Sequence, residues 1–180
     1  MESFELSGLL NGRSESIENE KEKNCYDILD SLNIKYQRVE YNFFPKEFEE
    51  LKLIDKTLQV DGIKNLIFRT KNKEQFYFII ILREDRFDEK AFRNKYGLSK
   101  ITMAKSEELE LLLKTHSGAV SIMELVNDKD NKIKLCIDEK VLNADYFRFH
   151  PNENKSTIRI SMEDFKNKLI PYLKHEINIL

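Results

Sequence analysis

Cysteine is scarce in this 180-residue sequence, which contains only Cys25 and Cys136. Two cysteines cannot build the disulfide framework of a small secreted domain or a four-ligand zinc site. The first residues also lack the basic and apolar segments of a signal peptide. We therefore expect a protein of the reducing cytoplasm in which both thiols are free.

Long hydrophobic runs are missing as well. The longest strong run, residues 76–82, has the length of a β-strand and falls far short of the roughly 18 residues that cross a membrane. We therefore expect no membrane partner.

A large excess of charge of one sign is also absent, because 30 Lys and Arg nearly balance 32 Asp and Glu for a net charge of −2. Proteins that coat nucleic acid are normally basic, so this balance argues against extensive contact with a nucleic-acid backbone. The charge is unevenly spread, since residues 1–24 carry a net −3 and the remaining 156 residues carry +1. The composition is therefore compatible with a protein that touches only the end of a nucleic acid.

Several motifs that indicate a familiar chemistry do not occur, namely GxGxxG, GxxxxGK[ST], HExxH and GxSxG. The three histidines, His116, His150 and His175, include no pair at metal-ligand spacing. Cys25 lies on the apolar stripe of a predicted helix, and Cys136 alternates with apolar residues in a predicted strand. We interpret both as small buried hydrophobes rather than nucleophiles, and we expect a site without a metal or a cofactor.

What is present indicates one α+β domain. Helical spacing and capping residues predict helices over residues 14 or 16 to 32, from Pro45, from Asp85 to 96, from Ser106 and from Ser161, the last kinked or ended by Pro171. Apolar runs predict strands over residues 35–41, 63–70, 75–82, 132–137, 146–149 and 157–161. Strands in hairpin-like pairs favour a mixed, largely antiparallel sheet over a doubly wound parallel one. We take residues 1–14 as an N-terminal arm of uncertain order and residues 15–180 as a single domain.

Three local features remain, and each has an ordinary structural explanation when taken alone. Lys64 and Asn65 open an apolar strand, where they are typical of an edge charge and a turn residue. Gly118 lies between a helix and a strand, where it is typical of a helix C-cap. The segment His150-Pro151-Asn152 is typical of a turn between strands.

Taken together and in order, these features resemble the YbaK-like family of aminoacyl-tRNA editing proteins, and most closely its freestanding prolyl-tRNA editing branch. The segments that carry the resemblance are residues 64–69, 118–121, 125–128, 141–142 and 149–152, with Thr157. The resemblance covers residues 25 to 173 or so, and its specificity comes from the order and spacing of the segments rather than from any one of them.

The resemblance implies a curved, partly barrel-like mixed sheet surrounded by helices, and a metal-independent ester hydrolase. The implied substrate is tRNA(Pro) whose terminal adenosine carries a wrong amino acid, expected to be alanine in this branch. By resemblance, Lys64, Gly118 and His150 are the catalytic residues, with the amides of the Gly118 loop as an oxyanion site. The implied substrate-binding residues are Asn65, Ala119, Val120, Ser121 and Asn152. The expected partners are the acceptor end of mischarged tRNA(Pro) and prolyl-tRNA synthetase.

The sequence departs from the family pattern in two places. Ile122 and Met123 stand where relatives commonly have proline and phenylalanine after the glycine loop, and Tyr41 stands where relatives often have a histidine. The amino acid removed is therefore left open between alanine and cysteine, and a non-catalytic sensor of an amino acid is a further alternative. Rejection of proline is expected from pocket size, and the candidate walls are Leu51 or Leu53, Phe78 and Ile80.

Overall fold

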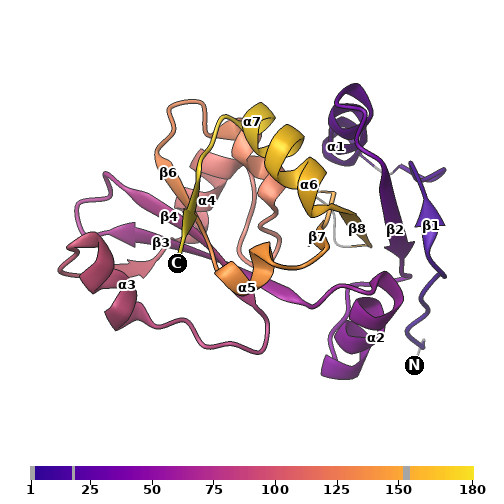
Figure 1. The fold of residues 1–180 in the computed structure, drawn as a ribbon, viewed down its shortest axis with the longest axis horizontal. Coiled ribbons are helices and arrows are strands. Elements are labelled where there is room, and N and C mark those ends of the chain that lie inside the picture. Colours follow the sequence, from indigo (N-terminus) through magenta and orange to yellow (C-terminus); the bar gives the residue numbers. More distant parts are fainter. Residues whose placement is uncertain (1–2, 18, 152–154) are drawn as a thin grey trace.

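The computed structural model describes residues 3–17, 19–151 and 155–180, and their strands form two sheets that lie side by side (Figure 1). The predicted α+β class with mixed, mostly antiparallel pairing is confirmed. The single curved sheet implied by the resemblance is replaced by two sheets, and the described strands do not close into a barrel.

The four-stranded sheet has the order β1-β2-β8-β7 and is antiparallel throughout. Its strands are β1 (Leu10–Asn11), β2 (Tyr36–Glu40), β8 (Ser156–Ser161) and β7 (Tyr146–Phe149). The N-terminal segment that we took as an arm contributes β1, and Leu6 forms a further antiparallel bridge with Tyr41.

The five-stranded sheet has the order β5-β3-β4-β6-β9. A hairpin of β3 (Ile63–Thr70) and β4 (Phe76–Leu82) is its antiparallel centre, while β6 (Ile133–Ile137) and β9 (Ile177–Ile179) add parallel strands. The short strand β5 (Ile101–Met103) pairs only with residues 68–70 of β3. The first half of β3 therefore lies at an open edge of the sheet.

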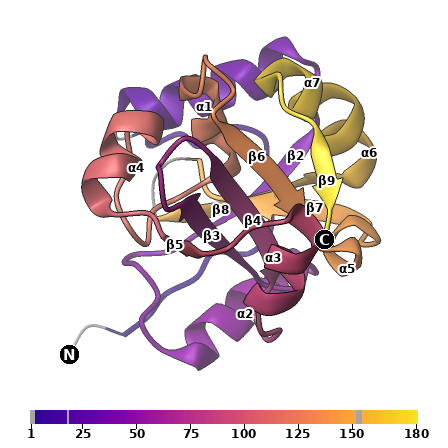
Figure 2. The ribbon, with the colours of Figure 1, turned by 90° about the vertical axis from the view of Figure 1, so that its left-hand side faces the viewer.

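Helices pack around both sheets (Figures 1 and 2). Apolar residues of α1 join a cluster with Tyr36 of β2, whereas those of α2 join a separate cluster with Val39 of the same strand, so the two helices cover opposite faces of the four-stranded sheet. The helical elements are α1 (Glu20–Ser31), α2 (Phe48–Leu58), α3 (Glu89–Tyr96), α4 (Ser106–Leu113), the 3₁₀ helix η1 (Ile122–Asn127), α5 (Glu139–Leu142), α6 (Met162–Asp164), the π-helix η2 (Phe165–Leu169) and α7 (Ile170–Leu173).

Three predicted helix starts were too early. The first helix begins at Glu20, because Asn19 rather than an earlier serine accepts from the Glu22 N–H group (2.9 Å). The second begins at Phe48 rather than Pro45, and the third follows an Asp88 cap rather than Asp85. Each segment holds more than one residue able to cap a helix, so local sequence leaves the start ambiguous.

The last helix follows the prediction at its start and departs from it at its end. The Ser161 hydroxyl accepts from the Asp164 N–H group (3.0 Å), as predicted. Pro171 does not end the helix, which passes through the π-helical turn η2 and continues to Leu173. Pro171 directly follows this π-helical turn, where the regular pattern of α-helical hydrogen bonds is already interrupted. Neither β9 nor the 3₁₀ helix was predicted.

The main core fills the space between the two sheets. Phe78 and Ile80 of β4 join it, while Ile79 and Ile81 point to the other face of the sheet and pack under α3. Cys25 and Cys136 are free and fully buried, which confirms the interpretation as small hydrophobes. No helix within the described residues is long and apolar enough to span a membrane.

Candidate functional site

Strand β3 presents Lys64 and Asn65 to opposite faces of the five-stranded sheet, since successive side chains alternate. The Lys64 ammonium group donates a hydrogen bond to the backbone carbonyl of Asp85, in the turn that follows β4. Asn65 lies on the same face as Ile63 and Ile67, toward the main core. Its side-chain amide donates to the carbonyl of Val120 (2.8 Å), which ties β3 to the Gly118 loop.

The Gly118 loop follows α4 and leads into η1. Gly118 has φ +88°, in the left-handed region that favours glycine, and a Cβ there would meet no atom within 4 Å. The Ala119 N–H group donates to the His116 carbonyl (3.1 Å). Among the described residues, the N–H groups of Gly118 and Val120 have no protein acceptor. The loop thus offers two free backbone donors, and Ala119 does not contribute a third.

Ser121 holds this loop against the end of β7. Its side chain is fully buried, and its hydroxyl donates to the carbonyl of His150 (2.7 Å). Its N–H group donates to a carboxylate oxygen of Glu124 (2.9 Å). Burial raises the pKa of Glu124 to about 7, although the hydrogen bonds from Ser121 and Thr115 act in the opposite direction. These contacts join the loop to His150 through the protein interior.

His150 follows β7 and is held as a neutral imidazole. Burial, reinforced by the nearby positive charge of Arg148, lowers the pKa of His150 to about 4. Its Nδ1 atom is buried without a hydrogen-bond partner in the described structure, and so is the Oδ1 atom of Asn65. Buried polar atoms normally have a partner, so two such atoms in one region indicate a place for a ligand or water.

Two adjoining cavities share Ile63, Asn65, Gly118 and His150. The first, which we call the edge cavity, has a volume of about 240 Å³ and is further lined by Lys64, Ile67, Met103, Ala104, Leu109, Ser117 and Val120. The second, which we call the inner cavity, has a volume of about 130 Å³ and is further lined by Tyr41, Phe44, Pro45, Leu51, Ile54, Arg83, Arg148, Phe149 and Thr157. Segments from both sheets and from α2 therefore meet at one site.

A charged cluster forms one wall of the inner cavity. Asp55 of α2 accepts from both terminal nitrogens of Arg83 (2.5 and 3.0 Å) and from Arg148 of β7. Two guanidinium groups thus surround one carboxylate, and the ion pairs fix α2 against both sheets. Nearby, the buried hydroxyls of Tyr41 and Thr157 lie 3.2 Å apart. Sequence reasoning missed both arginines, because Arg83 in the turn after β4 and Arg148 within β7 each have the pattern of a solvent-facing residue.

The structure brings most of the predicted residues together. Lys64, Asn65, Gly118, Val120 and His150 all line the edge cavity. Ala119 and Ser121 are buried behind the loop and line neither cavity, and Asn152 lies outside the described residues. Among the candidate walls, Leu51 lines the inner cavity, whereas Leu53 is exposed and Phe78 and Ile80 lie in the core.

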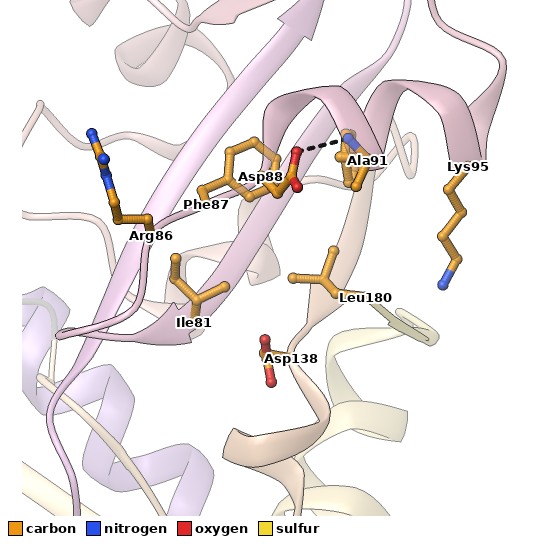
Figure 3. Close-up of a pocket in the computed structure, with 9 residues that line it drawn as sticks. Ile81, Arg86, Phe87, Asp88, Ala91, Lys95, Asp138 and Leu180 are labelled. Carbon is orange, nitrogen blue, oxygen red and sulfur yellow. Dashed lines mark hydrogen bonds between the residues drawn. The ribbon is translucent and has the colours of Figure 1, made fainter.

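Another cavity, of about 220 Å³, lies on the far face of the five-stranded sheet between α3 and Leu180 (Figure 3). Three of its polar side chains already have structural partners. Asp88 accepts from the Ala91 N–H group (2.8 Å), Lys95 donates to the Ile179 carbonyl (2.7 Å), and Asp138 accepts from the Lys140 N–H group (2.8 Å). This cavity contains no buried unpartnered polar atom among the described residues, so we do not assign it the function. The described residues also contain no group of three His, Cys, Asp or Glu that could hold a metal ion.

Several known proteins are similar to this chain in sequence or in fold. The chain is 31% identical over 139 residues to the prolyl-tRNA editing protein ProX of Acetoanaerobium sticklandii, covering 77% of this chain and 84% of that protein. It is 24% identical over 143 residues to the prolyl-tRNA synthetase associated domain-containing protein 1 of Mus musculus, covering 76% and 82%. A crystal structure of a proposed trans-editing enzyme for prolyl tRNA synthetase shares the fold with a TM-score of 0.64 at 16% identity, covering 92% of this chain and 98% of that one. The model of the aminoacyl-tRNA editing domain family matches residues 47–168, and this chain therefore belongs to that family.

Proposed function

We propose that this chain is an editing hydrolase that removes alanine from mischarged tRNA(Pro) without a metal ion. The observation that carries the proposal is the convergence of Asn65, Gly118 and His150 on two adjoining cavities. The names of its relatives, a prolyl-tRNA editing protein and a synthetase-associated domain protein, support the same substrate class.

Hydrolysis of an aminoacyl ester requires a positioned water and stabilisation of the negative charge that develops on the carbonyl oxygen. The free N–H groups of Gly118 and Val120 are suited to donate to that oxygen. We expect no contribution from the Ala119 N–H group, because it is committed to the His116 carbonyl. We therefore propose that, among the amides of the Gly118 loop, those of Gly118 and Val120 form the oxyanion site.

His150 acts in this proposal through hydrogen bonding rather than as a strong general base. Its pKa of about 4 leaves it neutral at pH 7, and a base this weak takes up a proton poorly. Its unpartnered Nδ1 atom and Asn65 Oδ1 instead orient the ribose hydroxyl and the α-amino group of the substrate. The 2′-hydroxyl of the substrate then assists proton transfer at the neighbouring ester.

Lys64 supplies a positive charge at the edge cavity. In the free protein its ammonium group is held by the Asp85 carbonyl. We propose that this ammonium group turns to the phosphate-ribose end of the substrate. It then exchanges the neutral Asp85 carbonyl for an anionic phosphate oxygen as its hydrogen-bond acceptor.

Selection of a small amino acid follows from the inner cavity. We propose that its apolar walls, Phe44, Pro45, Leu51 and Ile54, close around the methyl side chain of alanine. The pyrrolidine ring of proline would overlap these walls. Such overlap costs more binding free energy than a smaller amino acid loses by lacking a methylene group, so proline is rejected. The proposed partners are the acceptor end of tRNA(Pro) and prolyl-tRNA synthetase, and the location proposed with them is the cytoplasm.

The test is deacylation of Ala-tRNA(Pro) and Cys-tRNA(Pro) by the purified chain in the presence of EDTA. We expect hydrolysis of Ala-tRNA(Pro) that EDTA does not reduce, with Pro-tRNA(Pro) left intact. Faster hydrolysis of Cys-tRNA(Pro) would reassign the amino acid. Tight binding of a non-hydrolysable alanyl-adenosine analogue, with no hydrolysis of either ester, would make the protein a sensor rather than an enzyme.

A further inference from the structure

The open edge of β3 has a hydrogen-bonding pattern that the fold leaves unused. The backbone groups of Gly62 and Thr70 point toward β4. The Arg83 N–H group donates to the carbonyl of Gly62 (2.7 Å), and the Thr70 N–H group donates to the carbonyl of Gln75 (3.0 Å). Even-numbered residues therefore face β4, and odd-numbered residues face the opposite side. The bond from Ala104 N–H to the Ile67 carbonyl (2.8 Å) confirms that Ile67 faces β5.

Strand β5 does not extend far enough to use the remaining groups. It ends at Met103, and the chain enters α4 at Ser106, where a longer β5 would have paired with Asn65. Among the described residues, the backbone N–H and C=O groups of Ile63 and Asn65 therefore have no hydrogen-bond partner. Each residue presents a donor beside an acceptor along the open edge.

The edge cavity lies against this row of free backbone groups. Ile63, Asn65 and Ile67 line it from one face of β3, and Lys64 lines it although its side chain points to the other face, so the cavity reaches the edge of the strand. The end of β5, the apolar Leu109 of α4 and the Gly118 loop close the other sides. The half-exposed thioether of Met103 stands at the wall, and such groups pack favourably on aromatic rings.

We propose that the edge cavity binds the adenine ring of the substrate's terminal adenosine, read by the free backbone groups of Ile63 or Asn65. Adenine presents an acceptor nitrogen beside its 6-amino donor, which complements an N–H group beside a carbonyl. Guanine or inosine would place an oxygen acceptor opposite the strand carbonyl. The volume of about 240 Å³ is below the usual range for drug-sized ligands and suits a single nucleobase.

The geometry favours a base over a peptide strand. An extended peptide needs a run of edge residues, but β5 and α4 close this edge beyond Asn65. The cavity also shares Asn65, Gly118 and His150 with the inner cavity. Adenine in the edge cavity thus places the ribose and its ester beside the residues of the proposed hydrolysis, on which this inference rests.

The test is a titration of ¹⁵N-labelled protein with AMP, IMP and purine riboside 5′-monophosphate, which lacks the amino group. We expect AMP to shift the backbone amides of Ile63 and Asn65. Purine riboside monophosphate should bind roughly fivefold more weakly, the scale of one neutral hydrogen bond, and IMP about tenfold or more. Equal affinities for the three nucleotides, or shifts only elsewhere, would overturn the proposal. A short extended peptide that shifts these amides when AMP does not would overturn it in favour of strand docking.

A pair of variants controls for nonspecific effects. Met103→Ala should weaken AMP binding about threefold through lost ring contact, whereas Leu111→Ala, at an exposed position of α4 outside the cavity, should not. Because binding is measured without turnover, a failure of the deacylase proposal leaves this test intact. Conversely, equal deacylation of Ala-tRNA(Pro) ending in adenosine or in purine riboside would overturn the adenine site alone.

Discussion

The side-chain amide of Asn65 donates to the carbonyl of Val120 across 2.8 Å, and this contact fixes the Gly118 loop to the open edge of β3. The two residues are 55 positions apart in the sequence. The same side chain leaves its Oδ1 atom unpartnered beside the cavities. Asn65 therefore both holds the loop and presents an acceptor to a ligand.

Replacing Asn65 by aspartate should reduce kcat/KM for Ala-tRNA(Pro) by about 10²-fold, the scale of losing a positioned polar group. The carboxylate removes the donor to Val120 and places a negative charge against its carbonyl oxygen. Steady-state deacylation kinetics measure the effect. The same substitution at Asn94, exposed on α3, is the control and should leave kcat/KM unchanged. Equal activity of the two variants would contradict the role of Asn65.

Lys64→Ala should also reduce deacylation by about 10²-fold, since it removes a fixed positive charge from the edge cavity. The reference is Lys71→Ala, which deletes an exposed lysine of the β3–β4 turn and should have little effect. Thermal unfolding of both variants separates catalysis from stability. Full activity of Lys64→Ala would remove this residue from the mechanism.

Gly118→Ala and Gly97→Ala form a matched pair. Both glycines have positive φ, +88° and +64°, and a Cβ added at either would meet no atom within 4 Å, so each alanine should cost about 1 kcal/mol of stability through backbone strain. Of the two, Gly118 alone carries a free N–H group at the cavities. We expect deacylation to fall at least tenfold in Gly118→Ala and to persist in Gly97→Ala, as measured below the unfolding temperature of both. Parallel losses would show that Gly118 matters only for stability.

The sequence predicted correctly those elements whose ends are set by neighbouring residues, such as a turn or a helix cap. Strand β3 has the predicted limits because an apolar run lies between Gly62 and a polar turn, and Gly97 and Ser161 end and begin helices as predicted. Strand β9 was missed because a three-residue strand becomes visible only through its pairing with β6. The early start predicted at Asp85 failed because Asp85 pairs with Lys140 and its carbonyl serves Lys64, while Asp88 caps the helix.

The candidate site also contains residues that the sequence predicted and residues that it did not. The ordered segments of the family resemblance located Lys64, Asn65, Gly118 and His150, which the fold brings to one cavity. The Arg148 side chain escaped prediction because its partner, Asp55, lies 93 residues away on another element. The sequence also could not show which N–H groups of the Gly118 loop are free. Only the geometry of the turn shows that the Ala119 N–H group donates to the His116 carbonyl.

Gly62→Ala should destabilise the protein by about 1.5–3 kcal/mol, the range for hydrogen bonds to charged groups. A Cβ at this position would lie 2.1 Å from the Arg83 Cζ atom, so the guanidinium must shift, and we expect it to lose its two hydrogen bonds to Asp55. Gly8→Ala, whose Cβ would meet nothing within 4 Å, is the matched control. Urea denaturation compares the two variants. If both unfold at the wild-type midpoint, the Arg83 contact contributes no stability.

The ion pair between His175 and Asp128 should make stability depend on pH. Their side chains are almost fully buried, with His175 Nε2 3.0 Å from Asp128 Oδ2 and Nδ1 2.6 Å from the Leu173 carbonyl. Burial acts to lower the pKa of His175, but the hydrogen bonds to Asp128 and Leu173 outweigh it and raise the pKa above its usual value. Both ring nitrogens face acceptors, so the folded state favours the doubly protonated imidazolium.

A raised pKa means that the stabilisation is fully present below the unfolded pKa of about 6.5 and is lost as pH rises through the folded pKa. His175→Gln should therefore lower the free energy of unfolding by roughly 1–3 kcal/mol at pH 6 and by less at pH 9. Denaturant titrations at both pH values measure the difference. The exposed His116→Gln variant should show no such change. A His175→Gln deficit that stays constant from pH 6 to pH 9 would contradict a charged histidine in the folded protein.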